Sequence, residues 1–328
     1  MYLPESFGQA LLLTILSAVF WGSWANSYKG TRGYPFALFY WDYILGVVLA
    51  GVVFAFTLGS TGSAGEPFLA NLAAADRSNI GFALVAGAIF NIANVLLVAA
   101  LDIAGLSIAF PIAIGIAVVE GVLVSYALQP KGSVLFLSAG VALALLAVIF
   151  NAQAYRAIGT AGHDGSRRNR GIAISIISGL LMGIFAPLVT RALTHGHALT
   201  PYSVSVFFGI GALLCCFLFN TYLMRRPIEG APVTFGEYRR ADARNHILGL
   251  VGGVAWGCGG CLNFIAAGFV GVPISYAIGQ SAPMIAAAWG VFVWQEFRGA
   301  SSRAWRMLAM MTACYIAAIV VIALAYRG

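Results

Sequence analysis

The sequence contains few charged residues and very few histidines. Of its 328 residues, 9% are Asp, Glu, Lys or Arg, and the chain has 4 histidines. Because soluble domains carry about 25% charged residues, this composition excludes a soluble globular protein. Hydrophobic residues make up 61% of the chain, which indicates a membrane protein with several spans.

Motifs for catalysis and for metal binding are also lacking. Cys258 and Cys261 form a CxxC pair, but no second Cys or His pair lies near enough in the sequence to complete a zinc site. We expect no histidine–carboxylate cluster, because all four histidines fall in loops or at the ends of apolar segments: His163, His195, His197 and His246. We therefore expect no cofactor and no metal, and a membrane-embedded enzyme is the less favoured alternative.

Long apolar runs dominate what is present. A window of about 19 residues separates ten segments, at residues 7–28, 36–58, 79–101, 105–128, 133–153, 171–192, 202–224, 247–268, 272–294 and 305–326. The prediction is an all-α integral membrane protein with ten transmembrane helices. Its two five-helix halves are residues 1–153 and 171–328, and residues 154–170 form a cytoplasmic linker between them.

The basic residues predict the orientation. Of the 18 Lys and Arg residues, only Arg77, Lys131, Arg191 and Arg327 fall on the side that holds the termini. The other side holds the rest, and the excess predicts that it faces the cytoplasm. We expect a multi-pass protein of the cell (inner) membrane, with both termini on its outer side. The segment RRADARNH is a basic cytoplasmic stretch that suits contact with anionic lipid, and the net charge of +7 is not interpreted as nucleic-acid binding.

The two halves resemble each other. The segment GAIFNIANVLLVAALDIAGLSIAFPIAIG starts at Gly87, and GVAWGCGGCLNFIAAGFVGVPISYAIGQS starts 166 residues later, at Gly253. Gly105 then aligns with Gly271, and Phe110 with Tyr276. Five expected spans separate the copies, so the second copy is inverted in the membrane. Inverted repeats are typical of transporters, which bind substrate between the halves near the bilayer midplane.

Several motifs resemble those of a known family. GSW (22–24), YWDY (40–43) and QSAPMIAAAWG (280–290) with EFR (296–298) resemble the G-T-W, Y-L-D-Y and Q-A-L-P…F-W-G…E-Y-R motifs of the ureide permeases. The chain is similar to the drug/metabolite transporter superfamily, in the branch of the ureide permeases, glucose/ribose porters and rhamnose–proton symporters. Two features depart from the plant ureide permeases. The central linker is short, whereas they have a long central cytosolic loop, and Gly260 stands where they tend to carry Asn in the eighth span.

Two carboxylates are expected inside spans. Asp42 lies about 9 Å inside the second span, where a charge costs about 2.5–3.5 kcal/mol on insertion scales. It is either a proton-coupling or substrate-binding acid, as the resemblance implies, or a structural partner of Lys29 or Arg32. Glu120 lies deeper, with no basic residue at its depth. It is either a second proton-coupling candidate or a neutral acid held between helices.

Amides and aromatic residues are the candidates for substrate binding. The resemblance implies such a role for Asn94 and Gln280, while Asn91 and Asn263 are amides of equivalent spans that could equally bond between helices. The rings of Trp24, Trp256 and Tyr276 could stack on a sugar or a purine-like ring, as could Trp21. Glycines of the eighth span, from Gly249 to Gly260, predict close packing against a neighbouring helix.

The sequence therefore predicts a secondary-active uptake transporter. Its substrate is a small polar solute, namely a ureide or nucleobase-like compound or a monosaccharide, moved by alternating access and coupled to H⁺. An exporter of metabolites or drugs from the same superfamily and a passive channel are the other hypotheses. The remaining expected partner is membrane lipid.

Overall fold

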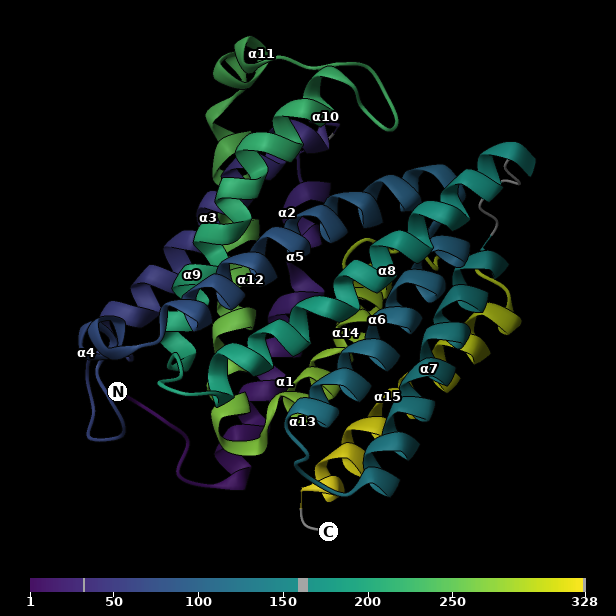
Figure 1. Ribbon diagram of the computed structural model, residues 1–328. Coiled ribbons are helices and arrows are strands. Elements are labelled where there is room, and N and C mark those ends of the chain that lie inside the picture. The colour runs from purple at the N-terminus through teal and green to yellow at the C-terminus, as the bar shows by residue number, and fades with distance from the viewer. Residues whose placement is uncertain (32, 159–164, 327–328) are drawn as a thin grey trace.

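The computed structural model describes residues 1–31, 33–158 and 165–326. Within these ranges every regular element is a helix and no strand is present. The long helices lie side by side in one bundle (Figure 1). The prediction of an all-α protein is confirmed.

Nine helical segments of the described chain are long and apolar enough to cross a membrane. Two are irregular. α1 (Phe7–Ser23) is followed closely by α2 (Ala25–Lys29), and α9 (Pro201–Cys215) continues through the π-helical turn η1 (Cys216–Asn220) into α10 (Thr221–Arg225). The others are α3 (Phe36–Phe56), α5 (Arg77–Ala104), α6 (Leu106–Leu128), α7 (Val134–Ala157), α8 (Gly165–Thr194), α12 (Ala243–Val270) and α15 (Ser302–Ala325).

The segment expected to be a continuous ninth span is broken. It consists of α13 (Val272–Gly279) and α14 (Ala282–Phe292), with Gln280 and Ser281 between them. Pro283 has no N–H and cannot donate to the Gly279 carbonyl, so one helical hydrogen bond is missing at the break. Neither piece alone is long enough to cross a membrane, so the prediction of one unbroken helix over residues 272–294 was wrong.

Glycines set the closest approaches between helices. A methyl group on Gly253 of α12 would overlap the Tyr43 carbonyl of α3, and one on Gly257 would lie 2.7 Å from Ala50. Close packing of the eighth span is therefore confirmed, and its neighbour is α3. A methyl group on Gly87 of α5 would overlap the Phe208 carbonyl of α9 in the same way.

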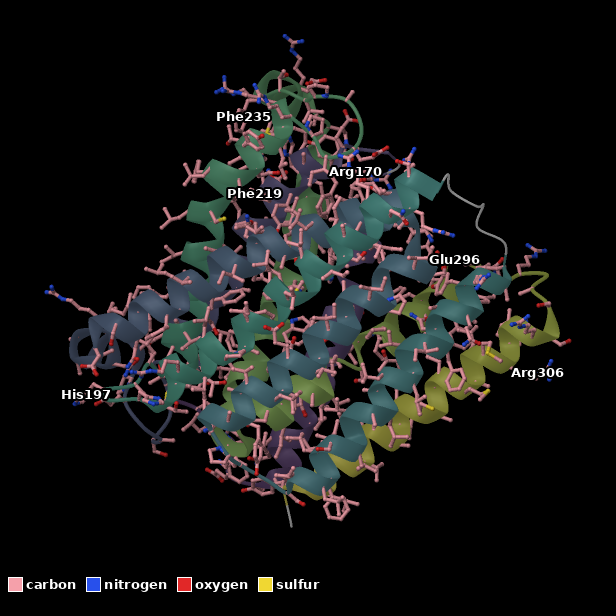
Figure 2. The ribbon with its side chains drawn as sticks, turned by 45° about the vertical axis from the view of Figure 1, so that its right-hand side comes forward. Arg170, His197, Phe219, Phe235, Glu296 and Arg306 are labelled. Carbon is pink, nitrogen blue, oxygen red and sulfur yellow. The ribbon has the colours of Figure 1, made fainter. Side chains whose placement is uncertain are left out.

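The two ends of the bundle differ in character. One end, called the basic end here, carries α2, α10 and the short helix α11 (Phe235–Arg240), while both termini and the short helix α4 (Phe68–Ala74) lie toward the other, the terminal end (Figure 1). Figure 2 shows Phe235, Arg170, Glu296 and Arg306 along the upper and right-hand side of the molecule, with His197 on the left-hand side.

Two sharp turns have the same backbone form. Gly105 joins α5 to α6 with φ 79°, and Gly271 joins α12 to α13 with φ 89°. Both angles lie in the left-handed region, which favours glycine. The two positions are the ones that the sequence alignment of the halves pairs.

Candidate functional site

A cavity of about 400 Å³ lies inside the bundle, between α1–α2, α5, α6, α8, α12 and α14. Its size falls within the range of about 300–1,000 Å³ of small-molecule sites. The lining is mainly apolar and rich in aromatic residues, which include Trp21, Trp24, Tyr28, Phe90, Phe185 and Trp256. This is a concave, apolar chamber suited to a flat solute.

The aromatic wall is built around Trp256, which is buried on α12. Its ring stacks on Phe90 with centroids 4.2 Å apart, and on Trp21 at 5.7 Å. Trp24 packs against Tyr43 at 5.0 Å. Because these rings hold one another, the wall is formed before any solute enters.

Two amides supply the polar groups predicted for the cavity. Asn94 comes from the middle of α5, and its Nδ2 donates to the Tyr40 hydroxyl at 3.4 Å. Gln280 comes from the break between α13 and α14. An amide both donates and accepts hydrogen bonds, so the pair can recognise a polar solute without carrying charge.

Three of the predicted binding residues lie outside the cavity lining. Asn263 donates to the Ser275 carbonyl at 2.9 Å, which ties α12 to α13. The Tyr276 hydroxyl donates to the Ala117 carbonyl at 3.3 Å, next to Gly121 of α6. Asn91 is fully buried beside Cys215 of α9. In this structure all three contact other helices instead of the chamber.

The cavity leads toward the basic end. Asp102, at the end of α5, is part of its lining and is exposed. A second cavity of about 420 Å³ shares Tyr28, Phe36, Val98 and Asp102 with the first and reaches the segment 227–233 that follows α10. The two cavities adjoin at these four residues and together extend from Trp256 to the segment 227–233.

Asp42 does not pair with Lys29, which forms an ion pair with Glu296, and Arg32 lies outside the described residues. Instead, Asp42 Oδ2 lies 2.8 Å from His246 Nδ1, and Oδ1 accepts from the Tyr238 hydroxyl at 2.7 Å. The expectation of no histidine–carboxylate cluster was therefore wrong. His246 lies four residues beyond the Asp242 cap of α12, and helix packing brings it to Asp42.

Glu120 lies where α6 crosses α8. A methyl group on Gly183 of α8 would lie 2.6 Å from Glu120 Oε2, so the absence of a side chain there makes room for the carboxyl group. Oε2 is buried and has no hydrogen-bond partner among the described residues. Glu120 is outside the cavity lining.

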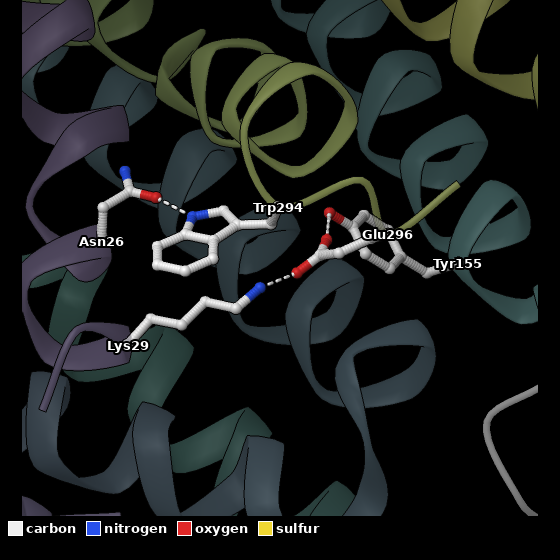
Figure 3. Close-up of polar contacts among 5 residues, drawn as sticks. All are labelled: Asn26, Lys29, Tyr155, Trp294 and Glu296. Carbon is white, nitrogen blue, oxygen red and sulfur yellow. Dashed lines mark hydrogen bonds and ion pairs between the residues drawn. The ribbon is translucent and has the colours of Figure 1, made fainter. Parts of the chain in front are cut away.

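A polar cluster joins α2 to the segment after α14. Lys29 pairs with Glu296, whose Oε2 also accepts from the Tyr155 hydroxyl at 3.1 Å. Trp294 Nε1 donates to Asn26 Oδ1 at 2.5 Å, and the Lys29 ammonium lies 4.5 Å from the Trp294 ring (Figure 3). These contacts hold the first and second halves together at the basic end.

The family model of the ureide permeases matches residues 39–164 and 153–325. The two matches cover most of the chain, including both halves. The chain belongs to the ureide permease family. It is therefore a multi-pass membrane transport protein and not an enzyme.

Several curated relatives match this ureide permease family member along nearly its whole length. Ureide permease 1 and ureide permease 2 of Arabidopsis thaliana are each 24% identical over 98% of both chains. Transmembrane protein 144 homolog A of Dictyostelium discoideum is 30% identical, but over 39% of this chain and 33% of its own.

A protein of known crystal structure has a similar fold. The two superpose with a TM-score of 0.67, at 16% identity, over 98% of this permease and 99% of the other chain. The description of that protein names no function, and the likeness concerns the fold alone.

Several residues of the permease's site were not singled out from the sequence. Phe90 and Phe185 line the cavity, yet in an apolar span a phenylalanine gives no signal of its own. Tyr238 was missed because it lies on α11, in a basic loop. A hint was available for the Lys29–Glu296 pair, since Glu296 belongs to the EFR motif and needs a partner near a span end.

Proposed function

We propose that this permease carries a small, uncharged, planar polar solute of the ureide or nucleobase type into the cell by alternating access. The observation that carries the proposal is the aromatic-rich chamber whose lining includes the amides Asn94 and Gln280. Flat rings stack on aromatic walls, and a ureido or lactam edge offers the donors and acceptors that two amides can pair with. The ureide permeases named above are consistent with this class.

A charged substrate fits the chamber less well. Among its described lining residues, the one ionisable carboxylate is Asp102, at the exposed mouth. Burying an unpaired charge among aromatic rings is costly. A monosaccharide could also stack on these rings, so it remains the substrate class against which the proposal is tested.

The proposed architecture is ten spans in two inverted halves, with α13 and α14 together forming the ninth span. Support comes from the paired turns at Gly105 and Gly271 and from the paired close contacts at Gly87 and Gly253. A break in a span at the substrate site is typical of transporters. The basic end faces the cytoplasm in this proposal, so the cavity described above opens inward.

Proton coupling is proposed to use Asp42, with Glu120 as the second candidate. Asp42 supports the proposal because it contacts a histidine, the side chain that most readily changes charge near neutral pH. Glu120 is the other carboxyl inside a described span that is remote from the ends, and one of its oxygens has no partner.

Transport by purified protein in liposomes tests the function. Vesicles loaded with unlabelled allantoin, uracil or glucose are placed in trace amounts of the same labelled compound. We expect counterflow with allantoin or uracil and little with glucose. Counterflow with glucose alone would replace the substrate class, and equilibration without counterflow would indicate a channel.

A further inference from the structure

Two loops occupy equivalent places in the two halves. Gln129 and Lys131 lie between α6 and α7, and Gln295 and Arg298 lie between α14 and α15. The two glutamines are 166 residues apart, the same offset that pairs Gly105 with Gly271. Each basic residue is followed by a glycine with positive φ, 91° at Gly132 and 76° at Gly299. Lys131 and Arg298 are 167 residues apart, one more than this offset, so the loops are related in backbone form and, with one residue inserted in the second, in sequence.

The first loop clamps the turn between α12 and α13. Gln129 Oε1 accepts from the Val272 N–H at 3.1 Å, and the Lys131 ammonium donates to the Phe269 carbonyl. Val272 begins α13, so its N–H has no acceptor within its own helix, and Gln129 provides one. The stem of Lys131 also packs on Gly271, where an added methyl group would lie 3.1 Å from Cδ.

The second loop makes no such contact with the turn between α5 and α6. Leu106, the counterpart of Val272, begins α6, and no described side chain caps that helix. Leu106 lines the cavity instead. Gln295 is exposed and has φ 51°, the one positive value of a described non-glycine residue. A side chain in this region is strained, so Gln295 is held in an unfavourable conformation without a visible partner.

An aromatic pair shows the same asymmetry. Tyr276 of α13 packs on Gly121 of α6 and bonds to the Ala117 carbonyl, which joins the halves. Its counterpart Phe110 lines the cavity, as does Pro283, the counterpart of Ala117. The contact made by Tyr276 has no equivalent at Phe110, and the cavity leads to that side.

We infer that Gln295 is a positioning residue for transport, which closes the basic end in the opposite state of the cycle. When that end closes, Gln295 accepts a hydrogen bond from the Leu106 N–H and Arg298 donates to the Ile103 carbonyl, the counterpart of Phe269. Phe110 then packs on Pro283. Gln129 releases Val272 in the same step, so the two glutamines clamp the two ends in turn. This inference rests on the proposed alternating access.

Crosslinking tests the clamp directly. In full-length protein whose five cysteines are replaced by alanine, Leu106→Cys is combined with Gln295→Cys, and Val272→Cys with Gln129→Cys as the matched pair. A short bis-methanethiosulfonate crosslinker should join both pairs in liposomes, and each crosslink should stop allantoin or uracil counterflow until it is reduced. If only the Val272/Gln129 pair is joined while the uncrosslinked protein still transports, the clamp is wrong and the proposed function stands. If no compound is exchanged, the proposed function itself fails.

Single substitutions separate a clamp from a merely structural role. Val98→Cys, in the cavity wall, reports how accessible the cavity is to an impermeant maleimide added at the basic end of membrane vesicles. Gln295→Ala should raise this labelling rate and Gln129→Ala should lower it, each by about two- to tenfold, the shift expected from losing one net hydrogen bond. Gln295→Glu keeps an acceptor oxygen and should restore the unmodified rate. Changes in the same direction for both alanine variants, or none, would overturn the inference.

Discussion

The Nδ1 atom of His246 lies 2.8 Å from Oδ2 of Asp42, which links the start of α12 to α3 at the basic end. The Tyr238 hydroxyl, from outside the spans, donates to the other oxygen of the carboxylate at 2.7 Å. Burial, and then the neighbouring Asp42, raise the pKa of Tyr238 above its ordinary value of 10.0. The phenol therefore stays protonated and keeps donating throughout the physiological pH range.

Replacing Asp42 by Asn should abolish accumulation of substrate driven by a pH gradient while leaving counterflow partly intact. The amide keeps nearly the same shape but cannot exchange a proton with His246 or pair with its charged form. Uptake of labelled uracil or allantoin into liposomes, with and without an imposed gradient, measures both activities. Accumulation equal to that of the unmodified protein would remove Asp42 from the coupling step.

Tyr238→Phe is the matched control for Asp42→Asn. It removes one donor from the carboxylate and keeps the contact with His246, so gradient-driven accumulation should persist. Because the raised pKa keeps the phenol neutral on both sides of pH 7, any effect of this variant should not depend on pH.

Glu120→Gln should reduce gradient-driven accumulation less than Asp42→Asn does. A larger loss in Glu120→Gln than in Asp42→Asn would place the proton site on α6.

Asn94→Ala should weaken substrate binding by about 1–3 kcal/mol, the usual cost of leaving a buried polar partner unpaired. Ligand-induced shifts in melting temperature, titrated with uracil and allantoin, measure the change because a ligand stabilises the state that binds it. Asn263→Ala is the control. The Asn263 amide donates to the Ser275 carbonyl and does not line the cavity. Its replacement should therefore lower the stability of the ligand-free protein and change substrate affinity little. Equal affinity of the Asn94→Ala and unmodified proteins would exclude Asn94 from the site.

The orientation in the membrane is open to a labelling experiment. Glu5 is exposed at the terminal end and Arg239 is exposed on α11 at the basic end. In a cysteine-free background we expect Glu5→Cys to react with an impermeant maleimide on intact cells, and Arg239→Cys to react only after the cells are opened. The reverse pattern would invert the orientation and would turn the cavity toward the outside.

The sequence predicted nine of its ten spans, because the bilayer imposes a length and a hydrophobicity on each of them. It also pointed to Asn94 and Gln280, since amides are conspicuous in an apolar helix and the family resemblance implies a binding role for both. It failed at Asp42, where the nearest bases in sequence, Lys29 and Arg32, were considered. The actual partners of Asp42 are Tyr238 of α11 and His246 of α12, which lie 196 and 204 residues away in the sequence. Such pairings depend on packing between distant helices.

The break in the ninth span shows a second limit. Pro283 signals an interruption in any helix, but proline is also common in unbroken transmembrane helices, where neighbouring groups satisfy the freed carbonyl. Only packing decides the outcome. Here Asn263 and Trp21 lie against Gly279, where an added methyl group would be 2.9 Å from the amide nitrogen and 2.7 Å from the indole ring. The backbone at Gly279 therefore lies against two side chains that the sequence places in other spans.

Two glycine-to-alanine substitutions should change stability in opposite directions. A methyl group on Gly253 would overlap the Tyr43 carbonyl and lie 2.9 Å from the Gly46 Cα, so α12 and α3 would have to move apart. Overpacking of this kind costs about 1–3 kcal/mol or more. A methyl group on Gly81 of α5 meets no atom within 4 Å, and alanine is favoured over glycine inside a helix by about 0.5–1 kcal/mol.

Melting of both variants in one detergent should therefore show a lower melting temperature for Gly253→Ala and an equal or higher one for Gly81→Ala. Equal losses in both would mean that the contact between α12 and α3 is not as close as the structure has it. A large loss for Gly253→Ala alone would support the close contact between α12 and α3, the two helices that carry His246 and Asp42.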